Sequence, residues 1–499
     1  MVKEHGILID GKWIKSGSGE TFESLNPANE KVIGKFQSCN NDDVNKAVNA
    51  AENVLDSWKD VPAPKRGEIL LRAAQLLRKN KERLAKLMTR EMGKVIAEAR
   101  GDVQEAIDIT EYMAGEGRRL FGHTTPSELR DKFCLGMRMP VGVFALITPW
   151  NFPIAIPSWK ITPALICGNT MVFKPASDTP LCAIEFVKVL EKAGVPKGVI
   201  NLVTGSGSKV GSALVKHKKI RGISFTGSRE VGEFVTREAG LKKVGLELGG
   251  KNGIIIMDDA DLKLATDGVI WGGYGTTGQR CTAASRIIVH EKIRSKFEKM
   301  LLNRTRKLRL GDGLKPKTDV GPLINNRAVE KTHEYTHIGL AEGAMMLCGG
   351  KPVKINGKGF FYEPTLFTNV APDMRIAQEE IFGPYISMIT VKNLDEAINV
   401  MNGITYGLSS AIYTNDIKNA FEAVERIEAG LTYVNSSTIG SEVHLPFGGI
   451  KGTGHAREAG WTGIEEFSDI KTVYFDYSGR LQKAQIDVVV GKKLKKHSE

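Results

Sequence analysis

The chain has 499 residues, 41% of them hydrophobic and 25% charged, which is the composition of a globular protein with room for two or three domains. No apolar run reaches the ~18 residues that span a bilayer, and the segment 1–6 lacks the apolar core of a secretory signal. The net charge of +12 raises nucleic acid as a partner. We therefore expect a cytoplasmic protein without a membrane partner.

The positive charge is spread over the chain. Basic clusters occur at 216–221, 304–309 and 492–496, without interleaved aromatic residues or a nucleic-acid motif. We interpret them as a solvated basic surface and predict no nucleic-acid partner. The many Lys and Glu residues would also suit a thermophile.

The N-terminal third begins with a strand-like hairpin at 6–13, followed by two predicted amphipathic helices at 42–58 and 66–92. From about residue 140, short apolar runs at 141–147, 170–173, 199–203 and 222–225 each lead into a turn and a helical segment. This alternation predicts an α/β fold with a parallel sheet covered on both faces.

A second series of apolar runs, at 253–257, 286–289 and 385–389, places a domain change near residue 250. The C-terminal part carries a strand-like segment at 471–477 and an apolar run at 486–490. Both are short for a domain of their own, so we expect them to pair with another chain.

A glycine-rich turn and a lysine, both in the first series of apolar runs, are candidates for contact with a phosphate. The pattern Gly205-x-Gly207-x-x-x-Gly211 follows a predicted strand, and such a turn can bring a dinucleotide to a helix N-terminus. A plain tight turn explains the same glycines. Lys174 ends a predicted strand, where it is either a ribose or phosphate contact or an ordinary surface lysine.

Three further segments carry polar groups of possible chemical use. Glu247 ends a strand-like run before Gly249-Gly250 and is either a general base or an ion-pair partner of Lys243 or Lys251. Asn151 is either a donor to a developing oxyanion or a turn residue. The acidic turn 379–384 is uninformative by itself.

One of the six cysteines differs from the others. Cys39, Cys134, Cys167, Cys182 and Cys348 fit small buried hydrophobes, and the six together match neither a disulfide framework nor a zinc site, so no metal is expected. Cys281 instead follows the turn 275–280 and has Arg280 beside it, a setting that favours the thiolate. A redox thiol, a metal ligand and a nucleophile all remain open at this point.

Taken together, six segments resemble the aldehyde dehydrogenase superfamily, in the order of that family and along nearly the whole chain. They are 147–153, 225–228, 247–251, 278–282, 379–384 and 446–449. The resemblance implies an α/β fold with a Rossmann-like cofactor domain, an α/β catalytic domain and a small β oligomerisation domain. The implied limits are 1–117 with 138–249 for the dinucleotide-binding domain, 250–467 for the catalytic domain, 118–137 with 468–490 for the oligomerisation strands, and 491–499 for a basic tail.

The resemblance also implies a mechanism and partners. Cys281 would attack an aldehyde, Asn151 and the Cys281 backbone N–H would hold the oxyanion, and Glu247 would activate water against the resulting thioester. With Glu247 present, hydrolysis to a free acid is expected, not transfer to coenzyme A. The partners would be a small-molecule aldehyde and further copies of the chain, in a homodimer or homotetramer.

By the same match, the dinucleotide would contact Lys174, which we also count among the catalytic residues, together with residues from five of the six segments and a few positions between them. The full predicted set is Ile147, Thr148, Pro149, Trp150, Asn151, Lys174, Ala176, Ser177, Gly207, Gly211, Phe225, Thr226, Gly227, Ser228, Val231, Glu247, Leu248, Gly249, Cys281, Glu380 and Phe382.

Ser177 departs from the family pattern. NAD-preferring relatives commonly place a glutamate three residues after the lysine, whereas this chain has Lys174-Pro175-Ala176-Ser177. The missing carboxylate and the added hydroxyl favour a 2′-phosphate, so we predict NADP as the preferred cofactor, with NAD also accepted as the alternative.

For the substrate, segments 156–160 and 440–449 look most like the subgroup that oxidises 2,5-dioxopentanoate (α-ketoglutarate semialdehyde). His444 departs from the glutamine expected there. Broad aliphatic or aromatic aldehydes, succinate semialdehyde and glyceraldehyde are the alternatives, and a non-catalytic binding protein is the alternative from another class.

Overall fold

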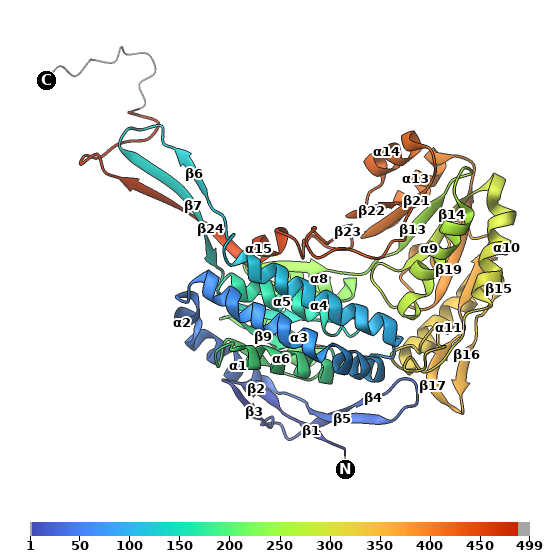
Figure 1. The fold of residues 1–499 in the computed structure, drawn as a ribbon, viewed down its shortest axis with the longest axis horizontal. Coiled ribbons are helices and arrows are strands. Elements are labelled where there is room, and N and C mark those ends of the chain that lie inside the picture. The colour runs from blue at the N-terminus through green and yellow to red at the C-terminus, as the bar shows by residue number, and fades with distance from the viewer. Residues whose placement is uncertain (1, 488–499) are drawn as a thin grey trace.

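Two seven-stranded sheets and a three-stranded arm organise the chain (Figure 1). The computed structural model describes residues 2–487. Within that range no helix has the length and apolar character needed to cross a membrane. The expected cytoplasmic location and thermophile character stay predictions.

The first sheet has the strand order β12-β11-β8-β9-β10-β2-β3. Its strands are β2 (Ile7–Ile9), β3 (Lys12–Ile14), β8 (Val143–Ile147), β9 (Thr170–Lys174), β10 (Ile200–Leu202), β11 (Gly222–Thr226) and β12 (Lys243–Glu247). The strands from β8 to β12 pair in parallel, and the hairpin of β2 and β3 adds an antiparallel edge. The carboxyl ends of five parallel strands therefore meet along one edge.

Both faces of the first sheet are buried, because alternate side chains pack under different helices. Phe144 and Leu146 join a core with α3 (Ala63–Met92), α4 (Ile96–Glu116), α5 (Ala155–Ile166) and α6 (Pro180–Ala193). Val143 and Ala145 join a core with α1 (Asn41–Asn53), α7 (Ser212–Lys216) and α8 (Arg229–Ala239). This explains why the strands read as continuous apolar runs in the sequence.

The second sheet has the order β15-β18-β19-β14-β13-β21-β22. Its strands are β13 (Asn252–Ile256), β14 (Ala284–His290), β15 (Met345–Cys348), β18 (Thr365–Thr368), β19 (Tyr385–Val391), β21 (Ser409–Tyr413) and β22 (Leu431–Val434). All neighbours are parallel except β15 and β18. The chain crosses from the first sheet to the second between Glu247 and Asn252.

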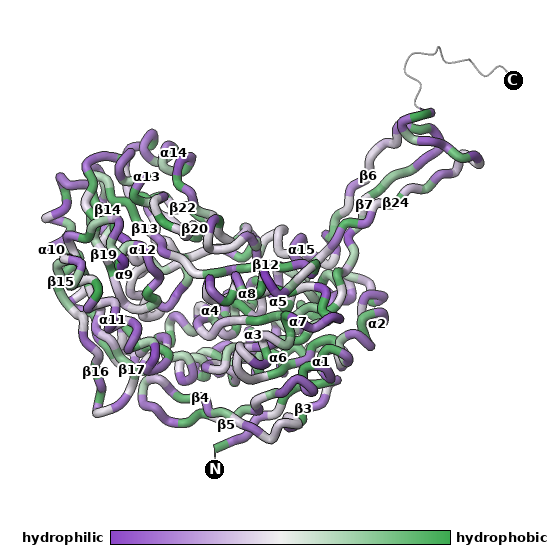
Figure 2. Tube along the Cα trace, turned by 180° about the vertical axis from the view of Figure 1, so that it is seen from behind, coloured by the Kyte–Doolittle hydropathy of each residue, from purple (hydrophilic) through white to green (hydrophobic). Residues whose placement is uncertain are grey.

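The arm is a separate antiparallel sheet of the order β24-β7-β6, formed by β6 (His123–Pro126), β7 (Lys132–Pro140) and β24 (Ser468–Asp476). It stands away from the body of the molecule in both views (Figures 1 and 2). Apolar side chains remain exposed on it, namely Phe133, Met137, Ile470, Tyr474 and Phe475. Both β6 and β24 are open edges.

The remaining strands form small sheets: β1 (Glu4–His5), β4 (Thr21–Leu25) and β5 (Val32–Gln37); β16 (Pro352–Ile355) and β17 (Lys358–Tyr362); β20 (Tyr406–Gly407) and β23 (Ile450–Lys451). The helices are α1 (Asn41–Asn53), α2 (Leu55–Lys59), α3 (Ala63–Met92), α4 (Ile96–Glu116), α5 (Ala155–Ile166), α6 (Pro180–Ala193), α7 (Ser212–Lys216), α8 (Arg229–Ala239), α9 (Leu262–Tyr274), α10 (Arg294–Thr305), α11 (Asn326–Ala341), α12 (Arg375–Gln378), α13 (Leu394–Asn402), α14 (Ile417–Arg426) and α15 (Thr462–Glu466), with short turns of other helix types at η1 (Gly207–Gly211), η2 (Gly275–Gly278) and η3 (Glu291–Ile293).

The predicted α/β architecture is confirmed, with differences at particular elements. The helix expected at 42–58 is two helices, α1 and α2, because the chain breaks at Val54. The strand expected at 471–477 is β24, but Ile486 and Asp487 lie outside any strand. Positions 488–490 of that apolar run and the basic tail 491–499 lie outside the described residues. The exact domain limits stay a prediction.

Candidate functional site

A cleft of about 660 Å³ opens between the two sheets and brings together residues that are distant in the sequence. The predicted residues among those that line it are Pro149, Trp150, Asn151, Thr226, Gly227, Ser228, Leu248, Gly249, Cys281, Glu380 and Phe382. The first sheet supplies the carboxyl ends of β8, β11 and β12, and the second supplies the turns before β14 and β19. The cleft is therefore a junction that neither sheet forms alone.

The turn that carries Cys281 has a strained backbone. Thr276, Thr277 and Gly278 have φ values of 51°, 58° and 69°, in the left-handed region where residues with a side chain are uncommon. Only glycine fits at position 278, because a Cβ there would lie 2.0 Å from the carbonyl oxygen of Gly383. The surrounding structure must therefore hold the turn in place.

Glu98 on α4 is one of the groups that hold this turn. Its carboxylate accepts hydrogen bonds from the Thr276 backbone N–H at 2.9 Å and from the Thr276 hydroxyl at 3.0 Å. Gln279 adds a second anchor, since its side-chain oxygen accepts from the backbone N–H of Ile324 at 2.9 Å. Our sequence analysis did not identify Glu98, because it lies 183 positions before Cys281 on a helix that it did not predict.

The Cys281 carbonyl ties the nucleophile to the first residues of the second sheet. Asn252 Nδ2 donates to that carbonyl oxygen at 2.7 Å and to the Ala283 carbonyl oxygen at 3.0 Å. A Cβ at Gly250 would lie 2.4 Å from the same oxygen. The Glu247–Lys251 segment and the cysteine turn thus pack in direct backbone contact, which explains the glycine at position 250.

The electrostatic setting of Cys281 differs from the expected one. Partial burial, together with the Glu247 and Glu380 carboxyls, raises the pKa of Cys281 to about 12. Arg280 does not offset this: its Nε donates to Thr276 Oγ1 at 2.8 Å, and its guanidinium stacks over Phe152. These contacts do not support the expectation that Arg280 favours the thiolate, because the charge of Arg280 is directed to other groups.

Glu247 ends β12 with its carboxyl group buried, at 3% exposure. Desolvation is the largest cause that raises its pKa well above the ordinary value, and Glu458 adds to it. Its Oε1 finds no hydrogen-bond partner among residues 2–487. The alternative of an ordinary ion pair fails, because Lys243 Nζ donates to the Ser468 carbonyl at 2.7 Å and the buried Lys251 Nζ makes no hydrogen bond within the same range.

A buried polar cluster of Lys160, Ser224 and Glu458 influences Glu247. Lys160 Nζ contacts Glu458 Oε1 in an ion pair and donates to Ser224 Oγ at 2.8 Å. The charge of Lys160 lowers the pKa of Glu247 while that of Glu458 raises it. These groups can adjust the basicity of Glu247 without touching the cleft. In the sequence, Lys160 stood out only as part of the segment 156–160, and nothing marked Ser224 or Glu458, because the three come from α5, β11 and the segment before α15.

Asn151 lies just beyond β8 and is 3% exposed. Its Nδ2 donates to the Gln279 carbonyl oxygen at 3.1 Å, which fixes the amide beside the Cys281 turn. An amide nitrogen has two protons, so a second donor stays available at this position. This hydrogen bond joins segments of the two sheets, so Asn151 does more than stabilise its own turn.

Glu380 and Phe382 close the other side of the cleft. Glu380 Oε1 accepts from the Gly250 N–H at 2.9 Å, and a Cβ at Gly249 would meet Glu380 Oε2 at 2.5 Å. Phe382, with φ 65°, packs edge-on against Trp150 at a centroid distance of 5.5 Å. The acidic turn thus forms a wall of the cleft with a carboxylate and an aromatic ring.

A second group of predicted residues lies at the ends of β8, β9 and β10. Lys174 is buried rather than on the surface; burial lowers its pKa to about 8, and its Nζ donates to the Pro175 carbonyl at 3.1 Å. The Thr148 N–H donates to the Lys174 carbonyl at 3.2 Å. Ser177 Oγ donates to the Gly205 carbonyl at 3.0 Å, which links the serine to the glycine-rich segment.

The glycine-rich segment continues into a short π-type helix and then α7, so it is more than a tight turn. Gly211 packs beside the Lys174 side chain, whereas a Cβ at Gly207 would meet nothing within 4 Å. At the start of α8, Ser228 Oγ accepts from the Val231 N–H at 3.4 Å. The structure places Ile147, Ala176 and Phe225 on the same strand ends, while Val231 is 43% exposed on the first turn of α8.

These residues fit an extended dinucleotide. Hydrogen-bond donors and positive charge come from the N-terminus of α8, the exposed Gly207 and the buried Lys174 ammonium. Among residues 2–487, the buried side-chain oxygens of Thr148, Asn151 and Thr226 have no hydrogen-bond partner in the protein. The Glu380 carboxylate could accept ribose hydroxyls. No group of three or more His, Cys, Asp or Glu side chains with metal-binding geometry occurs among residues 2–487.

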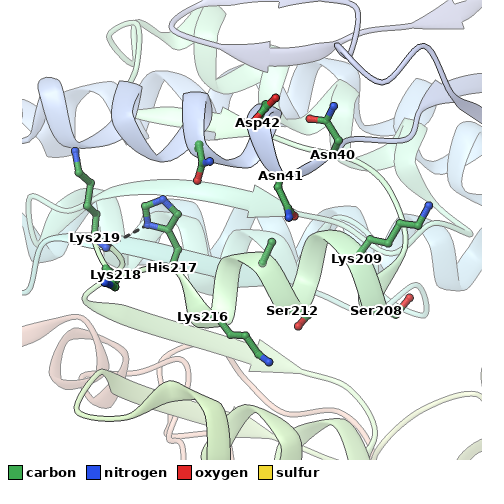
Figure 3. Close-up of a pocket in the computed structure, with 12 residues that line it drawn as sticks. Asn40, Asn41, Asp42, Ser208, Lys209, Ser212, Lys216, His217, Lys218 and Lys219 are labelled. Atoms are coloured by element: carbon green, nitrogen blue, oxygen red, sulfur yellow. Dashed lines mark hydrogen bonds between the residues drawn. The ribbon is translucent and has the colours of Figure 1, made fainter.

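A larger hollow of about 990 Å³ lies elsewhere, between α1 and the η1–α7 segment. Figure 3 shows its open, basic lining, which includes Lys209, Lys216 and Lys219. Lys216 pairs with Glu238 at 3.1 Å, and Lys219 contacts Glu52. The groove contains none of the predicted catalytic residues, and acids partly neutralise its lysines.

Comparison with known proteins agrees with the arrangement of the cleft. The model of the aldehyde dehydrogenase family matches residues 13–473. The chain belongs to the aldehyde dehydrogenase family. The resemblance seen in the sequence and the predicted fold are therefore confirmed, and the protein is an aldehyde dehydrogenase by its family.

Similar proteins include 2,5-dioxopentanoate dehydrogenase of Saccharolobus solfataricus, 43% identical over 95% of this chain and 99% of that protein. The α-ketoglutarate semialdehyde dehydrogenase of Haloferax volcanii is 44% identical over 94% of this chain and 98% of its own length. A crystal structure of betaine aldehyde dehydrogenase from Staphylococcus aureus in complex with NAD+ has a TM-score of 0.93 at 36% identity, and the match covers 95% of each chain.

Proposed function

We propose that this aldehyde dehydrogenase oxidises 2,5-dioxopentanoate, or a similar semialdehyde with a distal acid group, to the carboxylic acid, and that it prefers NADP. Cys281 and Asn151 line one cleft at the junction of the two sheets, and the Glu247 carboxyl at the end of β12 is near enough to Cys281 to raise the pKa of its thiol; this arrangement supports the reaction type. The substrate class rests on the relatives named above, two of which carry that activity in their names.

In the proposed reaction, Cys281 loses its proton to solvent and its Sγ forms a bond to the aldehyde carbon. The carbonyl oxygen becomes an alkoxide, which accepts hydrogen bonds from Asn151 Nδ2 and the Cys281 backbone N–H; one such donor contributes about 3 kcal/mol in other enzymes. A bound nicotinamide supplies the acceptor for the hydride that leaves the same carbon. An acyl thioester on Cys281 remains.

Hydrolysis then needs a base. Glu247 takes a proton from water as the water oxygen attacks the thioester carbon, and the C–S bond breaks to return the Cys281 thiolate and release the acid. A base in this role benefits from a pKa near the working pH, and the burial of Glu247 raises its pKa in that direction. Burial raises the pKa of the Cys281 thiol, so a bound cationic nicotinamide would favour the thiolate.

An aldehyde panel assayed with both cofactors tests this function. We expect reduced cofactor to accumulate fastest with 2,5-dioxopentanoate, and the free acid to appear in equal amount. Better turnover of uncharged aliphatic or aromatic aldehydes, succinate semialdehyde or glyceraldehyde would replace the proposed substrate with that one. No reduction with any aldehyde would favour a non-catalytic binding role.

Arg280 provides a sharper test of the acid group. Its guanidinium lies over the faces of Phe152 and Trp271, with centroid distances of 5.3 and 5.1 Å, next to the nucleophile in the chain. Because Arg280 Nε also donates to Thr276 Oγ1, Arg280→Gln can alter the reaction of every aldehyde; we expect it to raise KM for the semialdehyde by ~10-fold or more beyond its effect on an uncharged aldehyde of equal length. Equal effects on both aldehydes would argue against recognition of a carboxylate.

The cofactor preference rests on Lys174 and Ser177. A buried ammonium and a hydroxyl stand where a carboxylate would repel a 2′-phosphate, and Ser177 already faces the glycine-rich segment through its bond to Gly205. We expect kcat/KM to be higher with NADP than with NAD, and Ser177→Glu to reverse the order. A strong preference of the parent enzyme for NAD would overturn the proposal.

We assign the arm the role of an oligomerisation element. Its open edges at β6 and β24 and its exposed apolar side chains support pairing with another copy of the chain. Light scattering should therefore give the mass of a dimer or tetramer. Charged substitutions at exposed Ile470 and Phe475 should lower that mass, while a monomeric parent protein would contradict this role.

A further inference from the structure

Two histidines one turn apart on α11 approach each other outside the catalytic cleft. His333 and His337 occupy positions i and i+4, and their Nε2 atoms lie 3.2 Å apart. The ring centroids are 4.6 Å apart and the rings are inclined at 71°. The Nε2 atoms of the two rings therefore approach each other beside the helix.

Hydrogen bonds around His333 determine which of its ring nitrogens carries the proton. Thr336 Oγ1 donates to the Thr332 carbonyl at 3.3 Å and so accepts at 2.8 Å from the Tyr362 hydroxyl. With its own proton used, the Tyr362 oxygen must accept at 3.1 Å from His333 Nδ1. Neutral His333 consequently has its lone pair on Nε2, the nitrogen that faces His337.

This is the arrangement of a metal-binding histidine. Such a residue presents a bare nitrogen to the ion and donates its other N–H to a fixed oxygen, which sets the tautomer and the ring orientation. Tyr362 is fully buried on β17, the strand that packs against α11 (Figure 1), so the oxygen is rigidly placed. The partner histidine needs only to offer its own Nε2.

The distance between the two nitrogens suits a chelate. Bonds of ~2.1 Å from one ion to two nitrogens 3.2 Å apart enclose an angle of about 100° at the ion, between the values of square-planar and tetrahedral coordination. His337 is exposed and His333 partly so, which leaves room for water to complete the coordination.

We propose that His333 and His337 form a two-histidine site for a divalent transition-metal ion such as Ni²⁺, Cu²⁺ or Zn²⁺. The ion takes the place of the proton between the two Nε2 atoms and joins two successive turns of α11. Because borderline ions prefer imidazole, Mg²⁺ and Ca²⁺ do not bind there. The order of affinity follows the general series, with Cu²⁺ above Ni²⁺.

Calorimetric titration of the full-length, tag-free chain with Ni²⁺ tests the site. The titrations use a Cys281→Ala background, so that the active-site thiol does not compete for the metal. We expect one ion per chain and at least ~10-fold weaker binding after His337→Gln. His444→Gln is the matched control: its ring lies 3.5 Å from Glu442, a second place where a histidine and another ligand type meet on the surface.

A thermal-unfolding series gives a readout that does not depend on activity. Ni²⁺ should raise Tm in the parent and in His444→Gln but not in His337→Gln, because an ion that binds only the folded state stabilises it. Tyr362→Phe should keep the fold and weaken binding by ~10- to 100-fold through loss of the oxygen that orients His333. Equal affinity in parent and His337→Gln, or loss of binding in His444→Gln alone, would overturn the proposal.

Discussion

The sheet from β12 to β3 offers polar side chains just past the carboxyl ends of its strands, whereas the sheet from β15 to β22 offers its nucleophile on a turn that precedes β14. Glu247 is the last residue of β12, so a regular strand end sets its direction, and Asn151 lies four residues beyond β8, where its hydrogen bond to Gln279 fixes the amide. Cys281 comes from a turn with three successive left-handed residues. One sheet thus positions its groups by regular structure and the other by strain held in place by neighbours.

This difference shows where the geometry of the reaction is decided. The contacts of Asn252, Gly250 and Asn151 with the Cys281 turn all cross between segments that are distant in sequence. A change on the first sheet should remove one chemical step at a time, while a change at the crossing contacts should displace the nucleophile and slow the reaction from its first step. The following substitutions separate these cases.

The largest effect is expected for Glu247→Gln on the first sheet. Without the base, the steady-state rate should fall by ~10²- to 10⁴-fold, while the first turnover still produces a burst of reduced cofactor. Mass spectrometry of the quenched enzyme should show the acyl group on Cys281. Glu425→Gln, on the exposed side of α14, is the control, and undiminished turnover of Glu247→Gln would contradict the assigned role.

Asn151→Ala should come next. Loss of one donor to the oxyanion costs ~10²- to 10³-fold in kcat in other enzymes, and both the burst and the steady state should slow together. This distinguishes it from Glu247→Gln, in which the burst survives. Stopped-flow measurement of the first turnover makes the comparison, and an effect confined to KM would show that Asn151 only helps to bind the substrate.

Gly250→Ala tests the contact between the two sheets. The new Cβ would lie 2.4 Å from the Cys281 carbonyl oxygen, so the turn must move, and a shift of about 1 Å in a reacting group can cost ~10²-fold in rate. The rate of Cys281 alkylation should change as well. Gly101→Ala on exposed α4, where a Cβ meets nothing within 4 Å, is the matched control. Full activity of Gly250→Ala would show that the turn adapts freely.

The smallest effect concerns pH and the cofactor. Because burial lowers the pKa of Lys174 to about 8, the ammonium is present below that pH and is lost as the pH rises through it. From pH 7 to pH 9, KM should therefore rise more steeply for NADP than for NAD, by at most ~10-fold per pH unit. Lys174→Arg keeps its charge and should flatten the difference; parallel profiles for the two cofactors in the parent would exclude a phosphate contact.

The sequence by itself determined the elements with a strong local pattern. Apolar runs such as 141–147 and 170–173 predicted the parallel strands β8 and β9, and Cys281, Glu247 and Asn151 stood out through the segments around them. Glu98, Asn252 and Glu458 did not, because their roles come from partners far along the chain and no local pattern marks them.

Only the tertiary structure decided the state of Cys281. A neighbouring Arg280 predicted a thiolate, but the folded chain directs that guanidinium onto Phe152 and places the Glu247 and Glu380 carboxyls near the sulfur. The packing of the two sheets decides which charges lie near a side chain. A charged neighbour in the sequence does not predict them. The sequence thus determined which groups can react, and the packing of the two sheets determined their protonation and their distance from one another.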